Sequence, residues 1–220
     1  MTRYKCLVLD HDDTTVDSTR KVNYPQFRGS LARLRPKMTV SEDDFIRYCC
    51  DLGFYRMCDE ILHYTPDELE RHIADWRAYL KTHHAPFFPG IADVIRRQKD
   101  EGGIVCVVSH SYEDTIRPQY ERAGVLQPDI IFGAEYPAEQ CKPNPYPLEE
   151  LMRRYGLAPE ELLVVDDMPL GRQMARACGV PFAAAAWYGM PDFIREKLAC
   201  DCDYFLETVD DLSALLFSEK

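Results

Sequence analysis

Short runs of apolar residues recur along the chain, and each ends abruptly at polar residues. Residues 4–9, 104–108, 129–132 and 162–165 are such runs, and residues 181–187 form a further candidate. Runs of this length, rich in Val, Ile and Leu, are typical of strands that are buried on both faces of a parallel sheet. The pattern therefore predicts several short buried strands, each followed by a polar turn.

Segments with helical spacing of apolar residues alternate with these runs. They cover residues 91–100, 112–123, 147–155, about 171–178 and a last stretch through 211–216. Glycines follow four of them, as expected at helix ends: Gly102, Gly124, Gly156 and Gly179. Strict alternation of strand and helix implies parallel strands joined by right-handed crossovers. The expected fold class is therefore α/β, with a Rossmann-like parallel sheet and helices on both faces.

Residues 16–86 break this alternation, because they contain few strand-like runs. Thr65 and Pro66 make a good helix start, with Thr as N-cap and Pro at the first helical position. The helix that follows carries one apolar stripe, made by Leu69, Ile73, Trp76 and Leu80. We expect residues 16–86 to form a small all-α domain, inserted into an α/β domain made of residues 1–15 and 87–220. His83 and His84 fall in the returning linker and are expected at its surface.

Composition and charge exclude several classes of partner. A net charge of −11 argues against a basic surface for nucleic acid or anionic membrane. No apolar run reaches eighteen residues, and the first residues lead directly into a strand rather than a secretory signal. The nine cysteines have no spacing typical of zinc sites or disulfide frameworks, so we expect reduced thiols and a cytoplasmic location.

Chemically capable side chains follow the predicted strands. Asp10 and Asp12 come after the first strand, Ser109 follows the strand at 104–108, and Asp166-Asp167 end the strand at 162–165. Lys142 lies on a loop between the last two. Each residue alone has an ordinary explanation, such as a surface turn, a helix cap or a surface charge. However, open α/β sheets bind ligands at the carboxyl ends of their strands, where these side chains would meet.

In this order and at these spacings, the four groups resemble the motifs of the haloacid dehalogenase-like hydrolase superfamily. The position of the helical insert, just after the first motif, is similar to the subfamily of phosphoglycolate phosphatase and β-phosphoglucomutase. The resemblance implies that Asp10 is a nucleophile that forms a phosphoryl intermediate, and that Asp12 is the general acid and then the base for water. Ser109 and the backbone N–H of His110 would hold phosphoryl oxygens, while Lys142 would offset negative charge.

The resemblance also implies a Mg²⁺ cofactor. Its family ligands correspond to the side chain of Asp10, the backbone carbonyl of Asp12 and the carboxylate of Asp167, with Asp166 as a secondary ligand. Mg²⁺ prefers oxygen ligands of this kind. Two positions depart from the common motif: Asp13 stands where many members have glycine, and His110 where many have asparagine.

The expected function is hydrolysis of small phosphorylated metabolites. The acid at Asp12 favours phosphoryl transfer to water over dehalogenase or phosphonatase chemistry, since those relatives generally lack it. Two alternatives stay open: a sugar phosphomutase of the same superfamily, and a non-catalytic module that binds a phosphorylated ligand. The sequence fixes neither the substrate nor the choice between monomer and homodimer.

Overall fold

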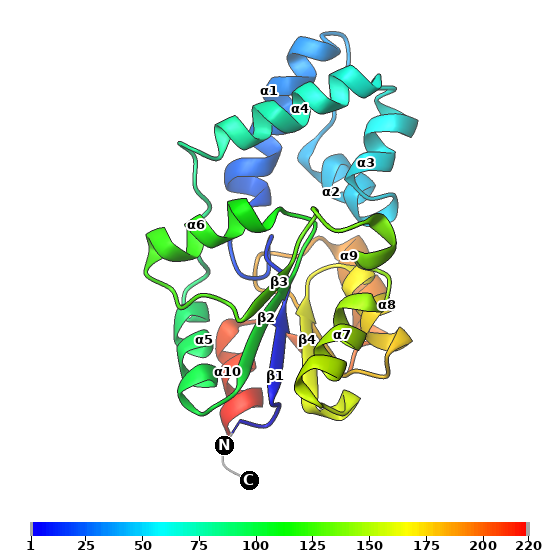
Figure 1. Cartoon of the computed structure of the whole chain (residues 1–220). Helices are drawn as coiled ribbons and strands as arrows, with labels where there is room; N and C mark the ends of the chain where they lie inside the picture. Colours follow the sequence, from blue (N-terminus) through cyan, green and yellow to red (C-terminus); the bar gives the residue numbers. More distant parts are fainter. Residues whose placement is uncertain (1, 219–220) are drawn as a thin grey trace. The chain divides into compact units, whose positions relative to one another are not determined.

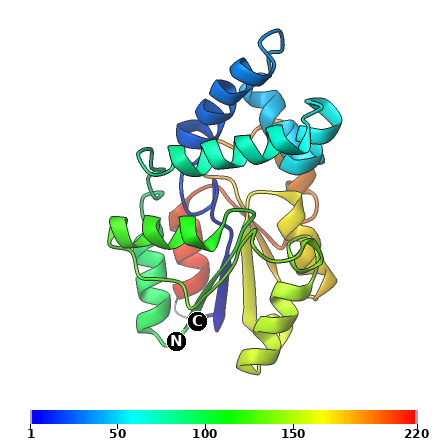
Figure 2. The same ribbon diagram turned by 45° about the horizontal axis from the view of Figure 1, so that its top comes forward.

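The structure is a computed structural model that describes residues 2–218. It divides into two compact units (Figures 1 and 2). The first combines the chain up to Asp17 with the chain from Pro86 onward, and the second is Ser18–Ala85.

A parallel sheet forms the centre of the first unit. Among the described residues its strands are β1 (Cys6–Leu9), β2 (Ile104–Val108), β3 (Ile130–Phe132), β4 (Leu162–Asp166), β5 (Phe182–Ala185) and β6 (Tyr204–Leu206). Their order is β3-β2-β1-β4-β5-β6, and every pairing is parallel. Cys6 lies opposite Ile104 of β2 on one side and Leu162 of β4 on the other. The strand that leads to Asp10 is therefore central, and the ends of β2 and β4 flank it.

Helices cover both faces of this sheet. They are α5 (Ile91–Asp100), α6 (Glu113–Ala123), α7 (Tyr146–Tyr155), α8 (Pro169–Ala177), α9 (Asp192–Ala199) and α10 (Val209–Phe217). In Figure 1, α5 and α10 lie on one side of the sheet, and α7 and α8 on the other. Leu7, Leu9 and Val165 belong to a buried cluster with residues of α5 and α10, such as Ile95 and Leu212. This arrangement confirms the predicted fold class.

Most helices of the sheet unit begin and end close to the predicted positions. Gly124 and Gly156 adopt left-handed backbone angles at the ends of α6 and α7, as the sequence indicated. Helix α8 begins at Pro169, two residues before the predicted start at Gly171, because proline fits the first turn of a helix. Helix α9 and strand β6 were not predicted from the sequence.

The second unit is helical. Its elements are a π-helical turn (Thr19–Asn23), α1 (Tyr24–Leu34), α2 (Glu42–Asp51), α3 (Phe54–Arg56), a second π-helical turn (Met57–Ile61) and α4 (Pro66–Tyr79). Thr65 caps α4, since its side chain accepts a hydrogen bond from the Glu68 N–H and the Glu68 carboxylate accepts one from the Thr65 N–H. This helix start was predicted.

The apolar stripe predicted for α4 is only half-buried. Leu69, Ile73, Trp76 and Leu80 are each partly exposed. The buried side chain of α4 is His72 instead, which is 2% exposed. Its ring contacts an aromatic group made of Phe27, Phe54 and Tyr64. His72 lies three positions after Leu69 and four before Trp76, so it belongs to the predicted face. The apolar spacing did not show that a histidine would be the most buried residue of that face.

His83 and His84 are exposed, as expected for a linker. All nine cysteines are free thiols. Within residues 2–218, we find no helix that is long and apolar enough to cross a membrane.

Candidate active site

Asp10 lies at the carboxyl end of the central strand. Its N–H donates to the carbonyl of Val165 over 2.9 Å, which extends the pairing of β1 with β4 by one residue. Its own carbonyl accepts a hydrogen bond from the Thr15 hydroxyl at 2.5 Å. Asp10 is only 5% exposed. Strand β4 and the turn after β1 thus fix the backbone of Asp10, and its side chain is almost fully buried.

Lys142 joins two of the acids. Its Nζ lies 2.6 Å from Asp10 Oδ1 and 2.6 Å from Asp166 Oδ2, and all three side chains are almost fully buried. Burial alone would lower the pKa of Lys142, but the two carboxylates outweigh it, so its pKa is raised. Lys142 therefore stays protonated and neutralises part of the buried negative charge.

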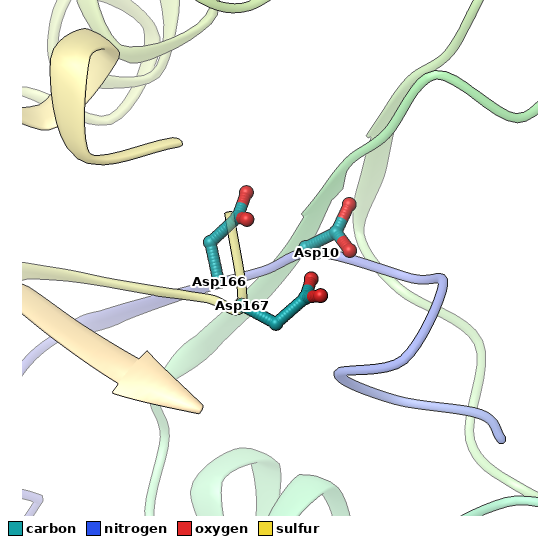
Figure 3. A group of neighbouring side chains, drawn as sticks. All are labelled: Asp10, Asp166 and Asp167. Carbon is teal, nitrogen blue, oxygen red and sulfur yellow. The ribbon is translucent and has the colours of Figure 1, made fainter. Parts of the chain in front are cut away.

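Three acids converge at this edge of the sheet (Figure 3). Oxygens of Asp10, Asp166 and Asp167 all lie within 4.8 Å of one another. Burial raises the pKa of Asp10 well above its usual range, opposed by Lys142 and reinforced by Asp166 and Asp12. Burial likewise raises the pKa of Asp167, reinforced by Asp10 and Asp166. One lysine is too little positive charge for three buried carboxylates.

The hydrogen bonds of these acids show where a cation would fit. Both oxygens of Asp166 are used, because Oδ1 accepts from the Met168 N–H at 2.8 Å and Oδ2 from Lys142. Asp167 accepts only a long bond of 3.4 Å from Thr14 at Oδ1. Its Oδ2 is buried and has no hydrogen-bond partner among the described residues. An all-oxygen cluster with an unsatisfied carboxylate suits a hard divalent cation.

The side chain of Asp12 contacts a serine of the loop that follows β2. Its Oδ2 accepts a hydrogen bond from Ser111 Oγ at 2.6 Å. The N–H of Ser111 donates to Ser109 Oγ over 3.0 Å. His110, between the two serines, places Nε2 2.9 Å from the carbonyl of Lys142. The structure thus brings the predicted residues of three separate segments into one network.

Three residues that were not predicted from the sequence support this network. Ser111 was not selected, although it lies two positions after Ser109. Gly171 of α8 was treated only as a helix start, but a Cβ atom there would lie 2.2 Å from Asp166 Oδ2. Trp187 Nε1 donates to the carbonyl of Thr14 at 3.1 Å, which fixes the turn that follows β1.

Asp13 adopts a φ of 57°, in the left-handed region where glycine is usual. The turn tolerates it because Asp is among the residues that enter this region at low cost. Asp13 is 3% exposed and is one of the charges that raise the pKa of Asp167. Its presence therefore adds negative charge beside the acid cluster.

The sequence and structure are similar to those of known proteins. A family model described as haloacid dehalogenase-like hydrolase matches residues 7–185. Pyrophosphatase PpaX of Halalkalibacterium halodurans is 24% identical over 160 residues, which cover 71% of this chain and 73% of that protein. Phosphoglycolate phosphatase of Rhodospirillum rubrum is 27% identical over 146 residues, 66% of this chain and 53% of that protein.

Among solved structures, a haloacid dehalogenase-like hydrolase from Bacteroides fragilis has a TM-score of 0.79 and 22% sequence identity. It aligns with 95% of this chain, and 99% of its own chain is covered. This likeness shows a shared fold over nearly the whole chain.

Proposed function

The chain belongs to the haloacid dehalogenase-like hydrolase family, and from this premise we propose that it is a Mg²⁺-dependent phosphatase of small phosphorylated metabolites that works through an aspartyl-phosphate. The protein is an enzyme of the phosphatase type, as its named relatives are. The observation that carries the finer proposal is the buried arrangement of Lys142 between Asp10 and Asp166 at the end of the central strand.

Asp10 is the proposed nucleophile. Its carboxylate oxygen attacks phosphorus, a P–O bond to Asp10 forms and the bond to the leaving oxygen breaks. Asp12 gives its proton to that leaving oxygen and later removes a proton from the water that attacks the intermediate. Lys142 and the hydroxyl of Ser109 stabilise negative charge on the transferring group. The products are an alcohol and inorganic phosphate.

Asp10, Asp167 and the backbone carbonyl of Asp12 are the groups proposed to hold Mg²⁺. Asp166 is a secondary ligand in this proposal, since both of its oxygens already accept hydrogen bonds within the protein. When bound, Mg²⁺ would compensate the buried carboxylates and polarise the phosphoryl oxygens.

The proposed substrates are small phosphate compounds. One relative is named for phosphoglycolate and another for pyrophosphate, so both compounds belong in any substrate panel. The chain's net charge of −11 disfavours nucleic acid as a partner. We propose a cytoplasmic enzyme, whose oligomeric state is to be measured with the same preparation.

The test is release of inorganic phosphate from a panel that includes 2-phosphoglycolate, pyrophosphate and sugar phosphates, with Mg²⁺ and with a chelator. We expect release only with Mg²⁺, and a fall of at least ~1,000-fold for Asp10→Asn. Asp100→Asn, at an exposed aspartate, is the matched control and should keep full activity. Acid quenching followed by mass spectrometry should find a phosphoryl group on the Asp10 peptide.

Three other results would contradict the proposed phosphatase function. Full turnover by Asp10→Asn would remove the proposed nucleophile. Phosphate that moves within a sugar phosphate without release would indicate a mutase. Saturable ligand binding with no turnover of any compound would indicate a binding module.

A further inference from the structure

The loop that follows β2 carries a second serine whose position is unusually well fixed. Ser111 is 6% exposed, and its hydroxyl donates to Asp12 Oδ2 at 2.6 Å. This length lies within the normal range for an O–H···O hydrogen bond. Asp12 itself follows β1, so the bond connects the ends of two neighbouring strands.

The backbone of Ser111 is held from the opposite side. Its carbonyl accepts a hydrogen bond from the Ala134 N–H at 3.0 Å. Gly133, just before it, has no side chain, and a Cβ there would lie 2.8 Å from the Ser111 carbonyl oxygen. Glu135 in turn accepts a hydrogen bond from the N–H of Glu113 at the start of α6. The segment after β3 therefore fixes the loop that carries Ser111.

We infer that Ser111 is a positioning residue for the general acid and base, Asp12. This inference rests on the proposed function and deepens it. A carboxylate that must deliver a proton to the leaving oxygen needs a fixed orientation, because small errors in the position of a catalytic group cost rate. Ser111 supplies that orientation through one side-chain hydrogen bond.

The two hydrogen bonds that Ser111 donates can be separated by substitution. Its N–H donates to Ser109 Oγ, and this contact involves only the backbone of Ser111. Ser111→Ala therefore removes the hydroxyl that orients Asp12 and leaves the contact to Ser109 in place. An effect of this variant can be assigned to Asp12 rather than to the phosphate-binding serine.

The deciding experiment compares two leaving groups. An alkyl phosphate, 2-phosphoglycolate or the ester that the panel ranks highest, has a poor leaving group that needs protonation. 4-Nitrophenyl phosphate has a good leaving group that departs without it. General acid catalysis contributes typically about 100- to 10,000-fold. We expect Ser111→Ala to lower kcat/KM for the alkyl phosphate by ~10-fold or more and for the aryl phosphate by less than ~3-fold.

A double-mutant cycle shows whether Ser111 acts through Asp12. In an Asp12→Asn background, Ser111→Ala should lower kcat/KM for the alkyl phosphate no further. Ser111→Thr, which keeps the hydroxyl, should recover part of the loss. Thr115→Val is the matched control, since it removes a nearby hydroxyl that donates only to the Tyr112 carbonyl.

Equal losses for both substrates, or losses that multiply with those of Asp12→Asn, would overturn the inference. Activity of Ser111→Ala on the aryl phosphate shows that the variant is folded, and an unchanged melting temperature is a second check. Failure of the proposed function looks different, because the wild-type enzyme would then release phosphate from neither substrate.

Discussion

Asp167 is the acid of the cluster whose charge is least compensated by hydrogen bonds. Asp10 and Asp166 each contact the Lys142 ammonium, whereas Asp167 accepts only one long bond from Thr14. An uncompensated buried carboxylate costs stability. The protein thus retains a residue that opposes its own folding, which is typical of a functional site.

Replacing Asp167 by Asn tests whether this carboxylate lowers stability and binds a cation. Without divalent cations the variant should melt at a temperature a few degrees higher than the wild type, because one buried negative charge is gone. Adding Mg²⁺ should raise the melting temperature of the wild type and leave that of the variant nearly unchanged. The measurement is a thermal melt with and without Mg²⁺, with Asp100→Asn as the control. A full Mg²⁺ response in Asp167→Asn would mean that Asp167 is not a ligand.

For single residues, the sequence indicated where the acids and the lysine would meet, but not which of their atoms would be in contact. The positions of Asp10, Ser109 and Asp166 follow from the ends of parallel strands, which a pattern of apolar runs reveals. The bond between Ser111 and Asp12 depends on side-chain rotamers and on a loop held by Gly133. Such contacts leave no periodic signal in the sequence.

At the level of secondary-structure elements, helix α8 lies close to the acid cluster at Gly171. A Cβ at Gly171 would meet the Asp166 carboxylate at 2.2–2.6 Å, a distance at which something must shift. Asp166 also accepts from the N–H of Met168, just before α8 begins at Pro169. The position of the Asp166 carboxylate therefore depends on the absence of a side chain at Gly171 and on the hydrogen bond from Met168.

Gly171→Ala should displace Asp166 from Lys142. We expect a loss of about 1–3 kcal/mol in unfolding free energy, typical of overpacking, and a fall of at least ~10-fold in kcat. Gly29→Ala in α1 is the control, because nothing lies within 4 Å of the added Cβ and alanine favours a helix. Urea unfolding and turnover of both variants check this expectation. It is contradicted if the two alanines behave alike.

Element boundaries were predictable where apolar periodicity and stop signals agree. Helix α5 has the predicted bounds, and glycines end α6 and α7 as expected. Helix α9 was missed because only Ile194 and Leu198 of its eight residues are buried, too few to make a pattern. Strand β6 has three residues and pairs on only one side, so its apolar run is equally short.

For the molecule as a whole, the helical unit and the sheet unit have separate cores. His72 lies in the core of the helical unit, where burial lowers its pKa from 6.5 to about 4, with Asp75 opposing and Arg33 assisting this change. Its Nδ1 has no hydrogen-bond partner among the described residues. A neutral histidine is thus favoured in the folded state.

This predicts loss of stability in mild acid. Between pH 6.5 and about 4 the unfolded chain binds a proton that folded His72 does not, so stability falls as the pH falls through this window. The loss should reach roughly 3 kcal/mol. Urea unfolding followed by the fluorescence of Trp76, in a Trp187→Phe background, reports on this unit. His72→Leu should make the unfolding midpoint much less sensitive to pH; an unchanged dependence would assign it to other groups.

The central place of β1 also bears on how the protein is made. Its partners, β2 and β4, begin at Ile104 and Leu162, so the first strand leaves the ribosome long before either neighbour exists. Ser18–Ala85, by contrast, is continuous and is complete while the sheet still lacks its second strand. The nascent chain therefore carries an unpaired, wholly apolar strand until β2 has been made, and a ribosome stalled before β4 has produced the helical segment but not the complete acid cluster.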